Sequence, residues 1–256
     1  MSPSDIVQTE IVGEIAVLRF NRPDKRNAVN DALIDFLGGW FAAPPKGVKV
    51  AVIAANGDHF SAGLDLSEHV ERDAFGVLKH SRRWHDALEK VQYGGLPVVA
   101  ALKGGVIGGG LEIAAAAHVR IAEPSAFFQL PEGRRGIFVG GGATVRVARI
   151  VGADRMTEMM LTGRRYSAQE GLRLGLAHYA VGEGEAEAKA MELAREIAGN
   201  AALSNYMMIQ AVSRISDMAP AEGLFAESMA AALAQTSGDA KAGLSAFLAK
   251  QKPRFD

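Results

Sequence analysis

The most informative absence in this sequence of 256 residues is cysteine. Without a thiol, the chain has no disulfide framework, no thiolate nucleophile and no cysteine-based metal site. The six histidines are scattered, with no HExxH motif and no pair four residues apart. We therefore expect no metal site, and a chain suited to a reducing compartment.

Charge imbalance and long apolar runs are also missing. Lysine and arginine total 28 against 29 acidic residues, for a net charge of −1, so there is no basic field to attract nucleic acid. No apolar run reaches the roughly 18 residues of a membrane span. The first twenty residues alternate and carry Asp5, Glu10 and Glu14, unlike a signal or transit peptide. We expect a cytoplasmic protein that binds neither membrane nor nucleic acid.

The two common phosphate-binding motifs are absent as well. The sequence contains no GxxxxGK[ST], and no set of its glycines has the GxGxxG spacing. Nucleoside-triphosphate and dinucleotide chemistry thereby lose their best sequence signal.

The stretch from 102 to 132 is where chemistry can be expected. A glycine-rich turn, 104–110, runs into a segment of high helix propensity at 111–117. Free backbone N–H groups at such a junction, approachable because glycine lacks Cβ, suit an oxyanion. Glu112 lies in the first turn, and Glu132 follows twenty residues later, after an apolar run. The two carboxylates and an N–H donor can thus meet at one pocket.

Each glutamate also has a structural interpretation. Glu112 can simply complement the helix dipole, and Glu132 can be a solvated loop carboxylate.

Strands and helices alternate along most of the chain, which indicates an α/β fold. A hairpin is predicted at 11–20 with its turn at Gly13, and Asn30 can cap a following helix. Between 67 and 92 lies a polar helical stretch, either a flap over the pocket or, as we favour, an exposed helix. Apolar strands are predicted at 48–55, 97–102, 119–122 and 126–130, a helix at 143–151, and helices only from 185 onward, at 185–200, 203–218, 221–235 and 239–250.

Seven short segments follow one another in an order typical of one protein family. They are NRPDKRNA (21–28), HFSAGLDL (59–66), LPVVAA (96–101), GGGLE (108–112), PE (131–132), LTGR (161–164) and GLRLGL (171–176). Together they resemble the enoyl-CoA hydratase/isomerase (crotonase) superfamily over nearly the whole chain.

The resemblance implies a spiral of ββα units, although no repeat is visible in the sequence. It divides the chain into a spiral core that carries the active site, 1–195, and a C-terminal helical region, 196–256. That region implies a homo-oligomer, either a trimer or a dimer of trimers.

The implied reaction is hydration of a 2-enoyl-CoA to a 3-hydroxyacyl-CoA. By resemblance, the amides of Leu64 and Gly109 stabilise the enolate oxygen. Glu132 supplies the proton to Cα, and Glu112 activates and holds the water, with the amide of Gly140 helping to position it. Family members that shift a double bond commonly use one carboxylate, so the retention of both favours a hydratase.

Coenzyme A enters as part of the acyl-CoA substrate, and no separate cofactor is implied. The positions that match coenzyme-binding residues of relatives are Lys25, Arg26, Ala28, Ala62, Asp65, Leu66, Phe247 and Lys250. Lys250 matches a residue that often reaches the coenzyme phosphates from a neighbouring subunit. The alternative for Lys25, Arg26 and Lys250 is a solvated surface charge.

The sequence departs from the family pattern at two places. His118 stands where relatives usually have Asp, which we interpret as a structural change. Arg134 and Arg135 follow Glu132 where relatives are usually apolar. These arginines either face solvent or a subunit contact, or one of them binds a carboxylate on the acyl group.

Two other functions stay open on this scaffold. One is isomerisation of a 3-enoyl-CoA to a 2-enoyl-CoA. The other is a noncatalytic binding role, as in RNA-binding relatives, which the near-neutral charge disfavours.

Overall fold

The computed structural model describes residues 6–68 and 71–255, and two sheets organise it. The larger sheet has six strands in the order β1-β2-β3-β4-β6-β9, and the smaller has three in the order β5-β7-β8. The strands are β1 (Val7–Val12), β2 (Ile15–Phe20), β3 (Val50–Ala55), β4 (Val98–Leu102), β5 (Gly105–Ile107), β6 (Val119–Ala122), β7 (Phe127–Gln129), β8 (Tyr166–Ser167) and β9 (Tyr179–Ala180).

The large sheet is mostly parallel. β1 and β2 form the predicted antiparallel hairpin, in which Gly13 turns the chain with a φ of 63°. From β2 onward, neighbouring strands of this sheet are parallel. Every residue of β3 and β4 is buried, as expected for parallel strands covered on both faces.

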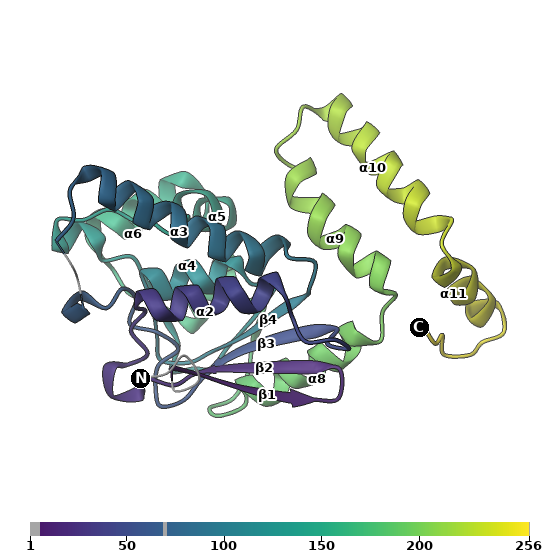
Figure 1. Ribbon diagram of the computed structural model, residues 1–256, viewed down its shortest axis with the longest axis horizontal. Coiled ribbons are helices and arrows are strands. Elements are labelled where there is room, and N and C mark those ends of the chain that lie inside the picture. The colour runs from purple at the N-terminus through teal and green to yellow at the C-terminus, as the bar shows by residue number, and fades with distance from the viewer. Residues whose placement is uncertain (1–5, 69–70, 256) are drawn as a thin grey trace.

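The helices before the C-terminal region pack on the two sheets and against one another. They are α2 (Asp31–Ala42), α3 (Ala74–Tyr93), α4 (Gly109–Ala116), α5 (Ala143–Val151), α6 (Ala153–Thr162), α7 (Ala168–Leu174) and α8 (Ala186–Ala198), with short 3₁₀ helices η1 (Pro23–Lys25), η2 (Leu66–Glu68) and η3 (Glu132–Arg135). The main core lies between one face and the layer of α2, α3 and α4, while α8 packs on the other face. Figure 1 shows these layers.

The chain repeats one path three times, which confirms the predicted spiral of ββα units. β4 lies in the large sheet, β5 in the small sheet, and α4 follows; β6, β7 and α5 do the same. The preceding turn runs from β3 through Ser61, which forms a parallel bridge with Val106 of β5, to α3. Because Ser61, β5 and β7 pair in parallel, the loop that follows each of them leaves the small sheet at the same end of its strands.

Helix starts follow the local sequence. The side chain of Asn30 accepts a hydrogen bond from the Leu33 amide, at 3.1 Å, and so caps α2 as predicted. The helix predicted from 67 begins only at Ala74 in α3, because Asp73 caps it through the Gly76 amide. Residues 69–70 of that prediction lie outside the described part.

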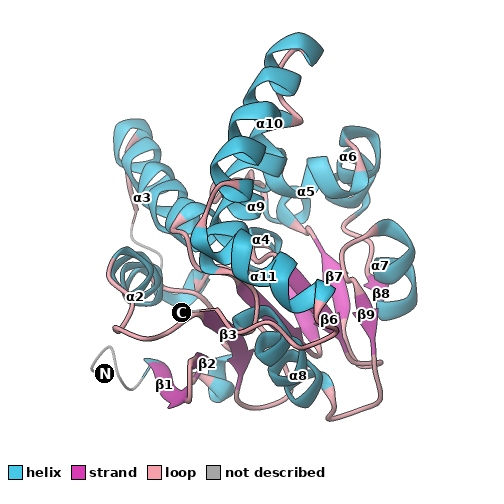
Figure 2. Ribbon diagram, turned by 90° about the vertical axis from the view of Figure 1, so that its right-hand side faces the viewer, coloured by secondary structure: helices cyan, strands magenta, loops and turns pink. Residues whose placement is uncertain are grey.

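The C-terminal helices project from the spiral as an arm. The arm consists of α9 (Ala202–Ile215), α10 (Pro220–Gln235) and α11 (Gly238–Leu248), and Figures 1 and 2 show α10 extending away from the sheets. The predicted domain boundary at 195/196 falls inside α8, whose packing on the sheet makes it part of the core.

The arm exposes an unusual amount of apolar surface. The side chains left open by α10 and α11 are Leu224, Phe225, Met229, Leu233, Leu244, Phe247 and Leu248. Within the described residues, no helix combines the length and the apolar character needed to cross a membrane.

Candidate active site

One cavity of about 490 Å³ collects all five residues predicted to be catalytic. Leu64, Gly109, Glu112, Glu132 and Gly140 line it together. They come from the loop after β3, the start of α4, η3 and the loop before α5. The spiral brings them together because each lies in the loop or helix start of a successive turn.

The backbone amides of Leu64 and Gly109 share one wall of this cavity. A parallel bridge joins Val29 to Leu64, but its hydrogen bonds use the Gly63 carbonyl and the Asp65 amide. The Leu64 N–H is thus left without an acceptor among the described residues, as is the N–H of Gly109 at the first position of α4.

Glycine is required at positions 63 and 109 of this wall, because neighbouring atoms lie too close for a Cβ. A Cβ on Gly63 would lie 2.6 Å from the Ile107 carbonyl oxygen and 3.2 Å from the Gly109 nitrogen. A Cβ on Gly109 would lie 2.7 Å from the Trp84 ring and 3.5 Å from the Leu64 nitrogen. The two amides are therefore neighbours, and only glycine lets them approach.

Glu112 is held by backbone from the next turn of the spiral. Its Oε1 accepts hydrogen bonds from the amides of Gly141, at 2.8 Å, and Ala143, at 3.0 Å. Burial raises the pKa of this carboxyl group, and the two amides oppose that effect. Glu112 is 4% exposed and lines the cavity, so the dipole interpretation alone does not account for it.

Glu132 is buried with less support. Its Oε2 and the indole Nε1 of Trp84 are the buried side-chain polar atoms that have no hydrogen-bond partner in the described part of the chain. Burial, and to a smaller extent the charge of Glu112, raise the pKa of Glu132 to about 7, against lowering effects of its own backbone amide and then of Arg135. Unpaired buried polar atoms are uncommon in folded proteins, and here both belong to cavity-lining residues.

Two groups at this site were missed by sequence reasoning. The amides of Gly141 and Ala143 hold Glu112; the prediction named only the amide of Gly140, as a group that positions the water, and named no donor for Glu112. Gly140 lines the cavity, and its carbonyl accepts a 2.6 Å hydrogen bond from Ser81 of α3. The glycine run at 140–142 was the available signal, but sequence does not tell which of its amides points at Glu112.

Helix α3 forms a wall of the cavity. Val77, Leu78, His80, Ser81 and Trp84 line it from this helix. Most of the helix is exposed or only partly buried, as favoured from the sequence, but its inner face packs into the core through Trp84 and its neighbours.

The predicted coenzyme-binding residues divide into two groups, of which the first surrounds η1 and η2. Lys25 donates a 2.8 Å hydrogen bond to Ser67 and lies 3.5 Å from the Asp65 carboxylate. Asp65 is buried and pairs with Arg22 at 2.9 Å. Burial raises the pKa of Asp65, but hydrogen bonds from Ser67 and Arg22 outweigh burial and lower this pKa to about 2. Asp65 thus orders this loop from inside.

The remaining residues of the first group are local. Leu66 lines the cavity, and Arg26, exposed with a φ of 50°, ends η1. The Arg26 carbonyl accepts the Ala62 amide at 2.9 Å, next to buried Ala28. This hydrogen bond joins the segment 21–28 to the segment 59–66.

The second group lies on the arm. Phe247 is 77% exposed in α11, and Lys250 follows that helix with a φ of 54°. Neither lines the cavity of its own chain.

His118 and the two arginines have clear structural settings. His118 Nδ1 accepts the Val98 amide at 2.9 Å, and its Nε2 contacts the Gln92 carbonyl; it is a bridge within the fold, as interpreted from the sequence. Arg134 donates to the Thr162 carbonyl. Arg135 lines the cavity.

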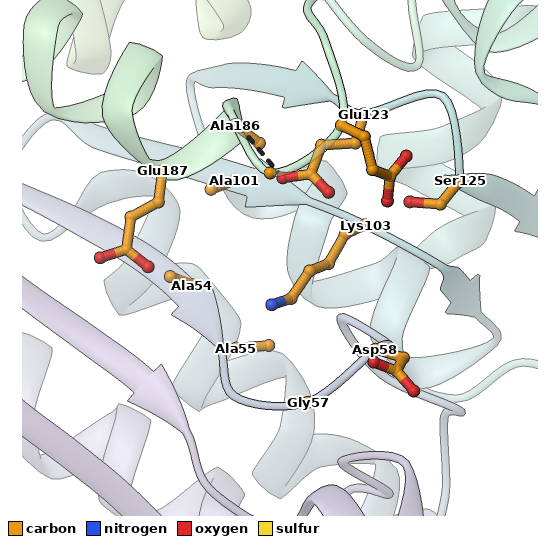
Figure 3. A pocket seen from close by; sticks show the side chains of 12 residues that line it. Ala54, Ala55, Gly57, Asp58, Ala101, Lys103, Glu123, Ser125, Ala186 and Glu187 are labelled. Atoms are coloured by element: carbon orange, nitrogen blue, oxygen red, sulfur yellow. Dashed lines mark hydrogen bonds between the residues drawn. The ribbon is translucent and has the colours of Figure 1, made fainter.

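A second cavity, of about 420 Å³, lies on the α8 side of the sheet. Figure 3 shows the Lys103 side chain directed into it, among the carboxylates of Asp58, Glu123 and Glu187. Glu123 is engaged with the Ala186 amide, and Glu187 with Arg19. None of the residues predicted for catalysis or coenzyme binding lies there.

Comparison with known proteins decides the family. The sequence profile of the family described as enoyl-CoA hydratase/isomerase matches residues 10–256. The chain belongs to this family. The protein is therefore an enzyme of the hydro-lyase class, as predicted, and the resemblance drawn from the seven motifs is confirmed.

Individual family members match over nearly their full length. The chain is 33% identical to 2,3-dehydroadipyl-CoA hydratase of Escherichia coli, with 94% of each chain covered. It is 34% identical to the short-chain-enoyl-CoA hydratase of Clostridium acetobutylicum, with 94% of this chain and 93% of the relative covered. A crystal structure of a putative enoyl-CoA hydratase from Rhodopseudomonas palustris superposes with a TM-score of 0.94 at 49% identity, covering 97% and 96% of the two chains. The predicted fold class is thus confirmed.

Proposed function

We propose that this member of the family hydrates a 2-enoyl-CoA thioester to a 3-hydroxyacyl-CoA. The observation that carries the proposal is the pairing, in one cavity, of two buried carboxyl groups with two backbone amides that have no acceptor among the described residues. Such amides suit an oxygen that gains charge, and such carboxyl groups suit water activation and proton transfer.

The thioester oxygen would accept hydrogen bonds from the amides of Leu64 and Gly109. Attack at Cβ moves electrons onto this oxygen as the enolate forms. Fixed N–H donors stabilise that charge without reorganisation.

The two glutamates would divide the proton transfers. Glu112, held at Oε1 by Gly141 and Ala143, has Oε2 available to take a proton from the attacking water, while the hydroxyl adds to Cβ. Glu132, whose pKa is about 7, gives its proton to Cα. After the reaction Glu112 carries the proton and Glu132 is ionised. Proton exchange with water then returns Glu132 to its protonated form and Glu112 to its ionised form. The amide of Gly140 would help to orient the water.

Coenzyme A is the carrier portion of the substrate, and the proposal requires no separate cofactor. Lys25 and Arg26 would meet the nucleotide end, and Ala28, Ala62, Asp65 and Leu66 would form the adjoining wall. Leu66 lines the cavity and Lys25 bonds to the adjacent Ser67, which supports this direction of entry.

The arm would assemble the chain into a homotrimer or a dimer of trimers. Support comes from the apolar side chains that α10 and α11 leave open, since such surface on one chain marks a protein interface. Phe247 and Lys250 would then reach the coenzyme of a neighbouring subunit. Light scattering should give the mass of a trimer or hexamer, and Phe225→Asp combined with Leu233→Asp should lower it. A monomeric wild-type chain would contradict the assembly.

A direct assay tests the function. Mixing the enzyme with crotonyl-CoA should remove the absorbance of the conjugated thioester and give a product heavier by one water. An isomerase would instead convert a 3-enoyl-CoA to the 2-enoyl isomer without water uptake. A noncatalytic member would turn over neither, and either of these results would reject the hydratase.

A further inference from the structure

Arg134 and Arg135 are neighbours in η3 with different surroundings. Arg134 donates to the Thr162 carbonyl at the end of α6, and its side chain packs where Gly163 lacks a Cβ. Arg135 is exposed to solvent where it lines the active-site cavity, and it makes no hydrogen bond, ion pair or cation–π contact with any of the described residues. The fold therefore uses the first guanidinium and leaves the second one available.

The position of Arg135 relative to Glu132 follows from the geometry of η3. In a 3₁₀ helix, side chains three residues apart lie one above the other, with about 2 Å of rise per residue. Glu132 and Arg135 are the first and last residues of η3, and both line the cavity. Three residues at this rise separate the two side chains by about 6 Å along the helix axis, which is comparable with the span of an extended acyl chain of roughly six carbons whose Cα is next to Glu132.

Apart from Glu132, the other titratable side chains of the described cavity wall have partners. His80 and Arg72 both contact Asp31, at 2.8 Å and 3.3 Å. Glu112 is held by two amides. The remaining wall near Arg135 is apolar, formed by Ile137 and Phe138. Arg135 is therefore the one charged group of the described cavity wall that has neither a bonded partner nor a proposed role in the reaction.

We propose that Arg135 binds a carboxylate at the far end of the acyl chain, so that the preferred substrate is a 2-enoyl-CoA of a short dicarboxylic acid. This inference rests on the proposed hydration at the same site. A planar guanidinium pairs with a carboxylate through two parallel hydrogen bonds, which fix the position of the acyl chain.

A substrate carboxylate bound to Arg135 would also change the pKa of the general acid, Glu132. The positive charge of Arg135 lowers the pKa of Glu132, which works against a proton donor. A substrate carboxylate on Arg135 neutralises that charge. A dicarboxylic substrate would therefore strengthen proton retention by Glu132, whereas a substrate ending in a methyl group would not.

The test compares two six-carbon 2-enoyl-CoA substrates, one ending in a carboxylate and one in a methyl group. The readout is the ratio of their kcat/KM values. Wild type should prefer the carboxylate-ended substrate, and Arg135→Gln should lower the ratio about 10- to 100-fold, mainly through a higher KM for that substrate. Arg135→Lys should give an intermediate ratio, because lysine keeps the charge but loses the fork.

Arg195→Gln provides the matched control. It removes the same charge from an exposed site on α8, outside the cavity, and should leave the ratio unchanged. Hydration of both substrates with an equal ratio in wild type and Arg135→Gln would overturn this inference alone. Hydration of neither substrate would overturn the proposed function, and this inference with it.

Discussion

Replacing Glu132 by Gln should lower kcat for hydration by about 10²- to 10⁴-fold, the range for loss of a positioned general acid. The carboxyl group is buried in the cavity and its Oε2 has no bonded partner among the described residues, so the substitution preserves shape and removes only the transferable proton. Rates of crotonyl-CoA hydration with wild type and variant measure the effect. A variant that retains more than a tenth of wild-type kcat would contradict the role of Glu132.

The pH dependence of kcat/KM of the wild-type enzyme should report the titration of Glu132. The pair works with one proton, so kcat/KM should follow a bell whose falling limb lies near pH 7, where the pair loses that proton. Hydration and dehydration should share this limb, because the overall equilibrium takes up no proton. Arg135→Gln should move the limb to higher pH, since Arg135 lowers the pKa of Glu132.

The pH dependence of the free energy of unfolding distinguishes a Glu132→Gln variant that has lost only its catalytic proton from one that has misfolded. The folded-state pKa of Glu132, about 7, lies above the ordinary value of 4.5. The folded chain therefore binds more protons between these values, and the wild-type free energy of unfolding falls as pH rises from 4.5 to 7. The gap corresponds to on the order of 3 kcal/mol. Glu132→Gln lacks this fall, so above pH 7 it should melt at a higher temperature than wild type.

Glu112→Gln should also lower kcat by about 10²- to 10⁴-fold, but for a different reason. The glutamine carbonyl can still accept from Gly141 and Ala143, so the loop before α5 keeps its anchor. What is lost is the negative charge that accepts the proton of the attacking water. The pH profile of the residual activity should lose its coupled form, because Glu132 then titrates without a neighbouring carboxylate.

A matched control for Glu112→Gln is Glu123→Gln. Glu123 is equally buried, at 5% exposed, and also accepts a backbone amide, that of Ala186 at 3.2 Å. It lies on the α8 side of the sheet, away from the active-site cavity. Its substitution should change kcat less than threefold. Equal losses in the two variants would mean that burying any glutamine, and not loss of the base, accounts for the effect.

Local sequence predicted most of the elements for physical reasons that operate within a few residues. Continuous apolar runs gave β3 and β4, because parallel strands are covered on both faces. Asn30 marked the start of α2 through a bond to its own helix. Alanine content and period marked the C-terminal helices within a few residues of their observed ends. The start of α3 was missed because 67–73 has a helical composition but Asp73 supplies the cap.

The candidate site was predictable as residue types but not as contacts. Glycines before a helix and two glutamates twenty residues apart indicate an oxyanion site with acid–base chemistry. The bonds from Gly141 and Ala143 to Glu112 span 29 and 31 residues, and sequence alone does not choose among neighbouring amides at that distance. Trp84 belongs both to the core and to the cavity wall, because one face of α3 serves both, and its local sequence does not predict this double role.

By itself, the sequence determined the kinds of groups available: a net charge of only −1, no thiols, a glycine turn entering a helix, and two acids at a fixed spacing. Only the tertiary structure decided which of them became unusual. Glu132 acquires a pKa of about 7 because packing removes its water and leaves its Oε2 without a described partner. Arg134 and Arg135 are the same residue type side by side, yet one is bonded to α6 and the other faces the cavity. Burial and pairing depend on which distant elements pack there, and that is set by the spiral.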